Sequence, residues 1–388
     1  MKANPGGHID PSDVIGRDKL IASLWRTLEQ QSLVLCAERR MGKTCVIDKM
    51  VAEAPLDKLL PAYRDLEGMR TPFEFAEMVF NDVKQYLSRS NRTMRRVHQL
   101  LEQIGGTEVG GVLKLPGVAA SHWKVLLTRT MEDLAENQDR TVIFFWDEVP
   151  LMLYNIKQRG DEGTAMELLD ALRSLRQMHS SLRMVFTGSI GIHNVITALK
   201  RDGYANDPTN DMETRDVPPL SPEDAQRLAR LLLKGEEIKT VDVNGTARAI
   251  GDAVDGIPYY IQHVVSQMRD RDIMESKATA REIVNTCLTD PLDHWHMSHY
   301  RERIDTYYTD EERPFALGLL DALAISDEPL IFSEVFNRLK SRMETEDSEM
   351  ARHILTLLQR DHYVIQRTDG TYSFRFPLIQ RWWRLHRG

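Results

Sequence analysis

Short apolar runs bounded by polar residues recur through the first half of the chain. They occupy residues 32–37, 60–66, 141–147 and 182–188 and read SLVLCA, LPAYRDL, TVIFFWD and LRMVFTG. The segments between them space their apolar residues as helices do, for example over residues 44–54, 71–87 and 163–179. Because buried strands that alternate with helices form parallel sheets, this half predicts an α/β fold with helices on both faces of the sheet.

The pattern changes near residue 220. From SPEDAQRLARLLL (221–233) onward the strand signals disappear and helical patterns follow one another, with Ser221 as the expected N-cap of the first. Helical patterns recur at 313–325, 332–341 and 347–360, and two alternating runs then meet at the turn residues Thr368, Asp369 and Gly370. Three helices and a hairpin are typical of a winged helix.

These changes predict three domains. We expect an α/β domain over residues 1–219, an α-helical domain over residues 220–311 and a winged-helix domain over residues 312–388. A glycine-rich insertion, GGTEVGGVLKLPG (105–117), is interpreted as a loop or small hairpin within the first domain.

The composition is typical of a folded globular protein but does not indicate which kind of molecule the protein binds. Of 388 residues, 42% are hydrophobic and 28% are charged, as in a folded globular protein, and the net charge of -8 disfavours general coating of nucleic acid. Cys36, Cys45 and Cys287 form neither a disulfide framework nor a zinc pattern. The first residues lack the apolar core of a signal peptide, and no run of about 18 apolar residues exists. We therefore expect a cytoplasmic protein without membrane association.

A candidate phosphate-binding loop, AERRMGKT (37–44), lies between a predicted strand and a predicted helix. It matches the pattern G-x-x-x-x-G-K-[ST] except that Ala37 replaces the first glycine. Backbone amides of the loop and the helix N-terminus would cradle phosphates, Lys43 would reach the β- and γ-phosphates, and Thr44 would bind Mg²⁺. The expected binding residues are therefore Arg39, Arg40, Met41, Gly42, Lys43, Thr44 and Cys45. The alternative interpretation is an exposed turn that opens an ordinary helix.

Polar residues follow two of the predicted strands. Asp147 and Glu148 end the run VIFFWDE, where Asp147 would hold Mg²⁺ through water and Glu148 would polarise the attacking water. In FTGSIG (186–191), Thr187 and Ser189 would place hydroxyls beside these acids, with Ser189 as a catalytic candidate. Two solvated acids, and a serine that only caps a helix, are the alternatives.

The motifs occur in a specific order: VIGRDKLIASL, RRMGKT, VIFFWDE, VFTGSIG, VPPLSPEDAQRL and DGIPYYIQ. In this order and spacing the chain resembles, over nearly its whole length, the archaeal-type ATPases of the STAND class (signal-transduction ATPases with numerous domains), relatives of AAA+ proteins. The resemblance implies an ATP- and ADP-binding, Mg²⁺-dependent ATPase with a P-loop domain, a helical lid and a winged helix. It places Ile15, Gly16 and Arg17 near the adenine, and Gly256 and Pro258 of the G-x-P motif against the nucleotide.

The chain also departs from that family. Ala37 replaces the loop glycine, no residue is recognisable as the sensor arginine, and we find no pattern within these 388 residues that predicts the repeat array or fused effector of many STAND proteins. One of three arginines could serve as an arginine finger that is supplied to a neighbouring subunit: Arg173, Arg176 or Arg183. The alternative is that they belong to a solvated face, as arginines on an amphipathic helix usually do.

Two functions follow from these observations. The first is a slow or partner-stimulated ATPase that acts as a regulatory switch toward a protein partner, an effector or a homo-oligomer, with defence or stress signalling as a family-level role. The alternative is a DNA-associated ATPase, similar to origin-recognition proteins or transposition regulators, whose winged helix binds duplex DNA. A third hypothesis is a nucleotide that is bound as a structural ligand and rarely hydrolysed.

Charges in the predicted winged helix bear on this choice. Residues 352–388 contain seven arginines and two aspartates, which favours an anionic surface nearby. Acidic residues nevertheless surround the start of the helix that would enter the major groove, and they would repel phosphate: Glu344, Glu346, Asp347 and Glu349. We therefore favour protein docking over DNA, and expect Trp382 and Trp383 to pack inside the protein rather than stack on bases.

Overall fold

The computed structural model describes residues 1–87, 107–109, 112–114, 122–159, 162–188, 196, 207–271 and 274–387. It divides into two compact units, which we call the sheet unit (residues 19–36 and 43–217) and the helical unit (residues 1–18, 37–42 and 218–388). None of the helices in the described part of the chain combines the length and apolar character that crossing a membrane requires.

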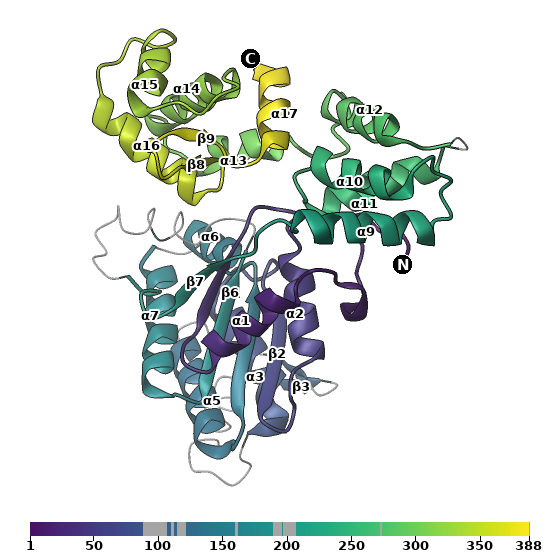
Figure 1. The fold of residues 1–388 in the computed structure, drawn as a ribbon. Coiled ribbons are helices and arrows are strands. Elements are labelled where there is room, and N and C mark those ends of the chain that lie inside the picture. The colour runs from purple at the N-terminus through teal and green to yellow at the C-terminus, as the bar shows by residue number, and fades with distance from the viewer. Residues whose placement is uncertain are drawn as a thin grey trace. The chain divides into compact units, whose positions relative to one another are not determined.

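The sheet unit contains a five-stranded parallel sheet in the order β2-β5-β6-β1-β7 (Figure 1). The strands are β1 (Leu33–Cys36), β2 (Leu59–Asp65), β5 (Thr141–Asp147), β6 (Leu182–Thr187) and β7 (Glu213–Asp216). The four apolar runs in the sequence correspond to β1, β2, β5 and β6, so the predicted parallel sheet is confirmed. The fifth strand was not predicted because its sequence, ETRD, has no apolar residue; among the described strands it pairs with β1 alone and lies at the edge of the sheet.

Helices cover both faces of this sheet. Among the described residues, the helices of the sheet unit are α1 (Asp18–Leu28), α2 (Lys43–Ala52), α3 (Pro72–Val83), α5 (Trp123–Asn137), α6 (Val149–Arg159) and α7 (Glu162–Met178), with a short 3-10 turn, η2 (Lys84–Tyr86). Phe144 and Trp146 of β5 join the core formed with α3, α5, α6 and α7. Phe145, between them, points to the opposite face and meets Trp25 of α1 edge-to-face, with ring centroids 6.3 Å apart. The predicted α/β fold class is thereby confirmed.

The glycine-rich insertion contains a small hairpin. Strands β3 (Thr107–Val109) and β4 (Val112–Lys114) pair antiparallel, which confirms the hairpin interpretation for the described part of residues 105–117.

The helical unit begins with a short 3-10 turn, η1 (Pro11–Asp13), and after residue 217 consists mainly of helices. Ser221 caps the first of these as predicted, because its hydroxyl accepts the Asp224 amide at 3.1 Å. The helices before residue 312 are α9 (Pro222–Gly235), α10 (Val243–Ala253), α11 (Pro258–Arg269), α12 (Lys277–Leu288) and α13 (His299–Tyr307). The predicted loss of strand signals beyond residue 220 is therefore confirmed for this stretch.

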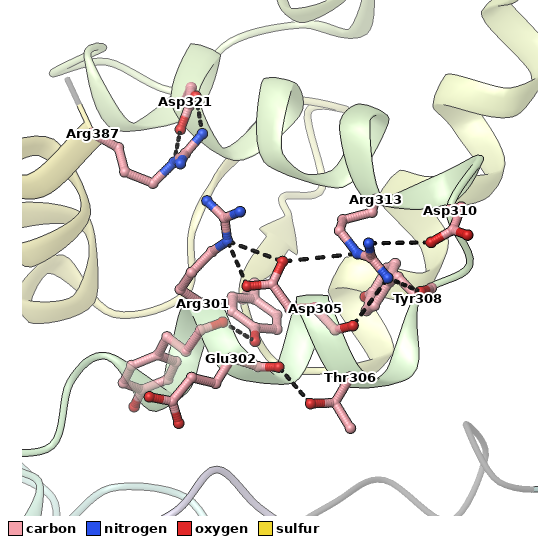
Figure 2. Close-up of polar contacts among 11 residues, drawn as sticks. Arg301, Glu302, Asp305, Thr306, Tyr308, Asp310, Arg313, Asp321 and Arg387 are labelled. Carbon is pink, nitrogen blue, oxygen red and sulfur yellow. Dashed lines mark hydrogen bonds and ion pairs between the residues drawn. The ribbon is translucent and has the colours of Figure 1, made fainter.

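The C-terminal segment (residues 312–387) has the predicted order of three helices and a hairpin. Its elements are α14 (Glu312–Ala324), α15 (Phe332–Lys340), α16 (Ser348–Arg360), β8 (Val364–Gln366), β9 (Tyr372–Phe374) and α17 (Pro377–Arg387). Gly370, in the turn between β8 and β9, has φ +83°. Trp382 and Trp383 of α17 are buried, as predicted, and the Trp383 indole donates to Asp321 at 2.7 Å. Asp321 also accepts two hydrogen bonds from Arg387, which fix the end of the chain against α14 (Figure 2).

Candidate functional site

Three elements of the sheet unit converge on the carboxylate of Asp147, the last residue of β5. Its Oδ2 accepts the hydroxyl of Thr44, in the first turn of α2, at 3.0 Å. Its Oδ1 accepts the hydroxyl of Thr187, the last residue of β6, at 3.3 Å. Asp147 and Thr187 are both buried, so the bond between them is protected from water, whereas the bond from Thr44 is part-buried. The structure therefore brings together two predicted ligands, Thr44 and Asp147, and the predicted hydroxyl of Thr187.

Glu148 follows Asp147 in an unusual backbone conformation. Its φ is +57°, in the left-handed region that non-glycine residues rarely adopt, and its amide donates to Asp147 Oδ1 at 3.0 Å. Its carbonyl accepts the Met152 amide, which continues into α6. Strain of about 1–3 kcal/mol in such conformations is found mainly at functional sites, where the surrounding structure imposes it. The turn from strand to helix thus fixes the backbone of Glu148 against the Asp147 side chain.

The end of β2 adds further negative charge to this region. Asp65 is the register partner of Asp147 across the β2–β5 pair, and Tyr63 lies on the same face of the strand. Burial raises the pKa of Tyr63, and the carboxylates of Asp147, Asp48, Asp65 and Glu148 raise it further. This electronegative environment suits a cation, and Mg²⁺ in nucleotide sites takes one or two protein ligands together with phosphate and water. The described residues contain no cluster of three or more His, Cys, Asp or Glu side chains that would hold a metal.

Lys43 begins α2, directly before Thr44. The helix runs for ten residues, Lys43–Ala52, and its first amides carry the partial positive charge of a helix N-terminus. Only 9% of Lys43 is exposed, although Thr44 beside it is exposed, and Cys45 is half-buried. An ammonium held at a helix N-terminus favours an anion there.

The preceding loop residues, 37–42, belong to the helical unit and are anchored inside it. Arg17 is 4% exposed and donates to the carbonyls of Met41 at 2.8 Å and Pro218 at 2.7 Å. Arg40 donates to the Tyr260 hydroxyl at 2.9 Å and lies over the Tyr259 ring at 4.3 Å, while Arg39 is exposed. The sequence predicted Arg17 and Arg40 as binding residues but gave no indication of these contacts.

The backbone of the loop explains why its first position tolerates alanine. Positive φ values occur at Arg40 (+72°) and Gly42 (+83°), whereas Ala37 is not among the residues with positive φ. The left-handed positions that favour glycine therefore lie later in the loop, and Ala37 is a buried residue in an ordinary conformation.

Two glycines of the other predicted motifs have clear steric reasons. Gly16 has φ +71°, and a Cβ there would lie 2.6 Å from the Asp224 carboxyl carbon. Gly256 has φ +70°, and a Cβ there would lie 2.5 Å from the Leu220 carbonyl oxygen. Both are in the helical unit, as are half-buried Ile15 and Pro258, the first residue of α11. Packing alone thus requires glycine at both positions. The predicted contacts, of Gly16 with adenine and of Gly256 with the nucleotide, stay predictions.

Two of the three candidates for an arginine finger form contacts within the protein instead. Arg176 is 7% exposed and forms a bidentate pair with Asp211 at 2.8 and 2.9 Å. Arg183 lies on β6, not on a helix, and donates to the Leu28 and Glu29 carbonyls. Both side chains form their contacts inside the protein. They therefore match neither the arginine finger for a neighbouring subunit nor the solvated helix face that the sequence suggested. Ser189, the remaining catalytic candidate, lies outside the described residues.

Comparisons with known proteins identify the fold. No protein-family model and no curated protein matches the chain. A Walker-type ATPase of Pyrococcus abyssi is similar with a TM-score of 0.63 and 15% identity, over 96% of this chain and 97% of that one. The ORC2 protein of Aeropyrum pernix, solved as ADPNP–ADP complexes, gives a TM-score of 0.57 and 11% identity over 98% and 96%. The chain therefore has the fold of these proteins, a P-loop NTPase α/β fold with a parallel sheet.

Proposed function

We propose that the protein binds and slowly hydrolyses ATP, and that its nucleotide state controls a protein partner or its own oligomerisation. The observation that carries this proposal is the arrangement at the strand ends, where Thr44 and Thr187 both donate to Asp147 and strained Glu148 follows. The two similar structures are named as a Walker-type ATPase and as ADPNP–ADP complexes, which supports ATP and ADP as the nucleotides.

Each residue of the site has a proposed role. Lys43 and the amides of Arg39 to Cys45 bind the phosphates, and Thr44 and Asp147 would hold Mg²⁺, which supplies charge neutralisation on the phosphate oxygens when bound. Glu148 orients the attacking water and accepts its proton. Thr187 keeps the Asp147 carboxylate in place, and Ser189 is proposed to contact the γ-phosphate or the water.

The remaining predicted residues would sense the nucleotide. We propose that Ile15, Gly16 and Arg17 lie near the adenine, and that Gly256 and Pro258 report the nucleotide state to the helical domain. With domains at 1–219, 220–311 and 312–388, the C-terminal segment would act as a winged helix of the STAND type.

Protein docking is preferred over DNA binding for that segment because its arginines are largely engaged within the protein. Arg384 donates to the Ala324 carbonyl and pairs with Asp327, and Arg387 pairs with Asp321. Arg381 donates to Asn285 at 2.7 Å. The exposed acids Glu344, Glu346, Asp347 and Glu349 surround the start of α16. This arrangement leaves limited basic surface for a duplex.

Binding and turnover of the full chain test this proposal. Lys43→Ala should lower ATP affinity by about 100-fold or more in calorimetry, since charge-assisted phosphate contacts are the strongest that the loop offers. Lys58→Ala, an exposed lysine before β2, is the matched control. Equal affinity of the folded Lys43 variant and the wild type would refute nucleotide binding by this loop.

Phosphate release with and without duplex DNA separates the alternatives. If the protein is a regulatory switch, phosphate release should be slow and not stimulated by DNA. DNA binding should then be weak and sensitive to salt. Stimulation by DNA that is lost in an Arg360→Gln, Arg367→Gln variant, which removes two exposed arginines, would establish the DNA-associated alternative. Tight ATP binding without release of phosphate would instead identify the nucleotide as a structural ligand.

A further inference from the structure

A buried carboxylate of the loop takes no part in the chemistry described above. The Glu38 side chain is 0% exposed, and its Oε1 accepts the Arg39 amide at 2.8 Å and the Arg303 guanidinium at 2.7 Å. Burial acts to raise the pKa of Glu38, but Arg303 and His299 outweigh it and lower the pKa well below its usual range. Glu38 is therefore ionised, and the same oxygen shapes the loop and attaches it to α13.

Arg303 extends this contact to the C-terminal segment. Its guanidinium lies 3.8 Å from the carboxylate of Asp361, directly after α16, and over the ring of Tyr363 at 5.4 Å. Asp361 is 2% exposed and accepts the Tyr308 hydroxyl at 2.7 Å. One guanidinium thus lies between two buried carboxylates, one in the phosphate loop and one in the C-terminal segment.

Exposed residues of α13 also contact the C-terminal segment. Asp305 accepts the Arg301 guanidinium at 3.0 Å and lies 3.8 Å from that of Arg313, while Arg313 also donates to the Asp305 carbonyl at 3.0 Å (Figure 2). Because Arg313 belongs to α14, α13 should move together with the beginning of the C-terminal segment. Single solvent-exposed ion pairs contribute little, so Arg301 offers a control on the same helix.

We propose that Glu38 is a positioning residue of the phosphate loop, and that the ion-paired series Glu38, Arg303 and Asp361 couples nucleotide binding to the C-terminal segment. This inference rests on the proposed function, since it assigns a regulatory connection to the same loop. Because Glu38 accepts the Arg39 amide of the loop, a bound phosphate that reshapes the loop should move the Glu38 carboxylate. The ion pair between Arg303 and Asp361 should then change as well. Coupling is reciprocal, so if bound nucleotide alters the Arg303–Asp361 contact, a change at Asp361 should alter nucleotide affinity.

Calorimetry on the full chain measures the first consequence. Glu38→Gln and Asp361→Asn should each weaken ADP and ATP binding, within the range of about 5- to 150-fold that allosteric couplings cover, and their effects should not add in the double variant. Tyr308→Phe removes one hydroxyl and should give a smaller weakening with an intact fold. Arg301→Gln, the control, should bind nucleotide as the wild type does.

Hydrogen exchange measures the second consequence. In the wild type, nucleotide should change amide exchange in residues 348–366, and Glu38→Gln at saturating nucleotide should abolish that change. The proposal is overturned if Asp361→Asn and Tyr308→Phe bind nucleotide with wild-type affinity, or if saturated Glu38→Gln still transmits the full change to residues 348–366. Absence of nucleotide binding by the wild type would overturn the proposed function instead, so the two failures are distinguishable.

Discussion

The candidate residues of the sheet unit (the sheet half) and those of the helical unit (the helical half) are stabilised in different ways. In the sheet unit, Asp147, Thr44 and Thr187 hold one another through short hydroxyl–carboxylate bonds at the ends of packed parallel strands. In the helical unit, loop residues 38–41 are held by side chains from distant parts of the sequence, such as Arg17, Tyr260 and Arg303. The first half is fixed by its own sheet, whereas the conformation of the second depends on helices far along the chain.

This difference separates catalysis from affinity. Changes at Asp147, Glu148 and Thr187 of the sheet half should alter the chemical step, because these groups face the reacting phosphate in the proposed function. Changes in the helical half should alter nucleotide affinity and its response to the C-terminal segment. Each prediction below tests one side of that comparison.

The largest effect is expected at the general base. Glu148→Gln should slow hydrolysis by about 10²–10⁴-fold while ATP stays bound, because the amide cannot accept the proton of the attacking water. Single-turnover phosphate release and calorimetry on the same sample measure both quantities. A parallel loss of ATP affinity would show that Glu148 also determines binding, and equal turnover would place the base elsewhere.

Removal of Arg17 should affect mainly affinity. Arg17→Met leaves the Met41 and Pro218 carbonyls without their buried donor, at about 1–3 kcal/mol for each unsatisfied group. We expect ATP affinity to fall by about 10- to 100-fold and the single-turnover rate at saturation to remain within about twofold. Arg39→Met, at an exposed arginine of the same loop, is the comparison variant. A strongly reduced rate at saturation would contradict the separation of the two halves.

The pH dependence of stability should report on the helical half. Asp255, next to Gly256, accepts the Leu378 amide at 2.6 Å, and burial raises its pKa from 3.8 to about 6, against the opposing effects of that amide and Arg381. The folded state therefore binds more protons than the unfolded state between about pH 4 and 6, so this carboxyl lowers the free energy of unfolding as pH rises through that window.

Asp255→Asn should remove this contribution, about 2–3 kcal/mol between the two ends of the window. Urea denaturation of the wild type and the variant at pH 4.5 and 7 measures it. Asp252→Asn, an exposed acid three residues earlier, should leave the pH profile unchanged. Identical profiles for wild type and Asp255→Asn would show that this carboxyl titrates normally in the folded protein.

The smallest effect is expected at Thr187. Thr187→Val keeps the shape but removes the hydrogen bond to Asp147, which contributes about 0.5–1.5 kcal/mol. Turnover should fall by roughly 3- to 10-fold, and the Mg²⁺ concentration for half-maximal rate should rise. Thr187→Ser should restore both. A loss as large as that of Glu148→Gln would mean that Thr187 contacts the reacting groups directly.

The sequence predicted the sheet half better than the helical half, for a physical reason. Parallel strands bring their carboxyl ends to one edge, so Thr44, Asp147 and Thr187 could be placed together from strand order and motif spacing alone. The loop contacts join residues hundreds of positions apart, such as Glu38 with Arg303, and no local periodicity marks such pairs. Charge patterns also misled the interpretation of Arg176 and Arg183, because burial of an arginine depends on its tertiary partners.

The edges of the sheet also limit how copies of this protein can associate. At one edge of the described sheet, β7 consists of charged and polar residues, ETRD, and at the other β2 contains Pro61, which lacks an amide to donate. Both features are protections against growth of a sheet by addition of further strands. Proteins whose edges are blocked in this way resist amyloid-like aggregation from the folded state. An oligomer that responds to nucleotide would therefore have to assemble through helices and loops, whose contacts can break and reform at each turnover.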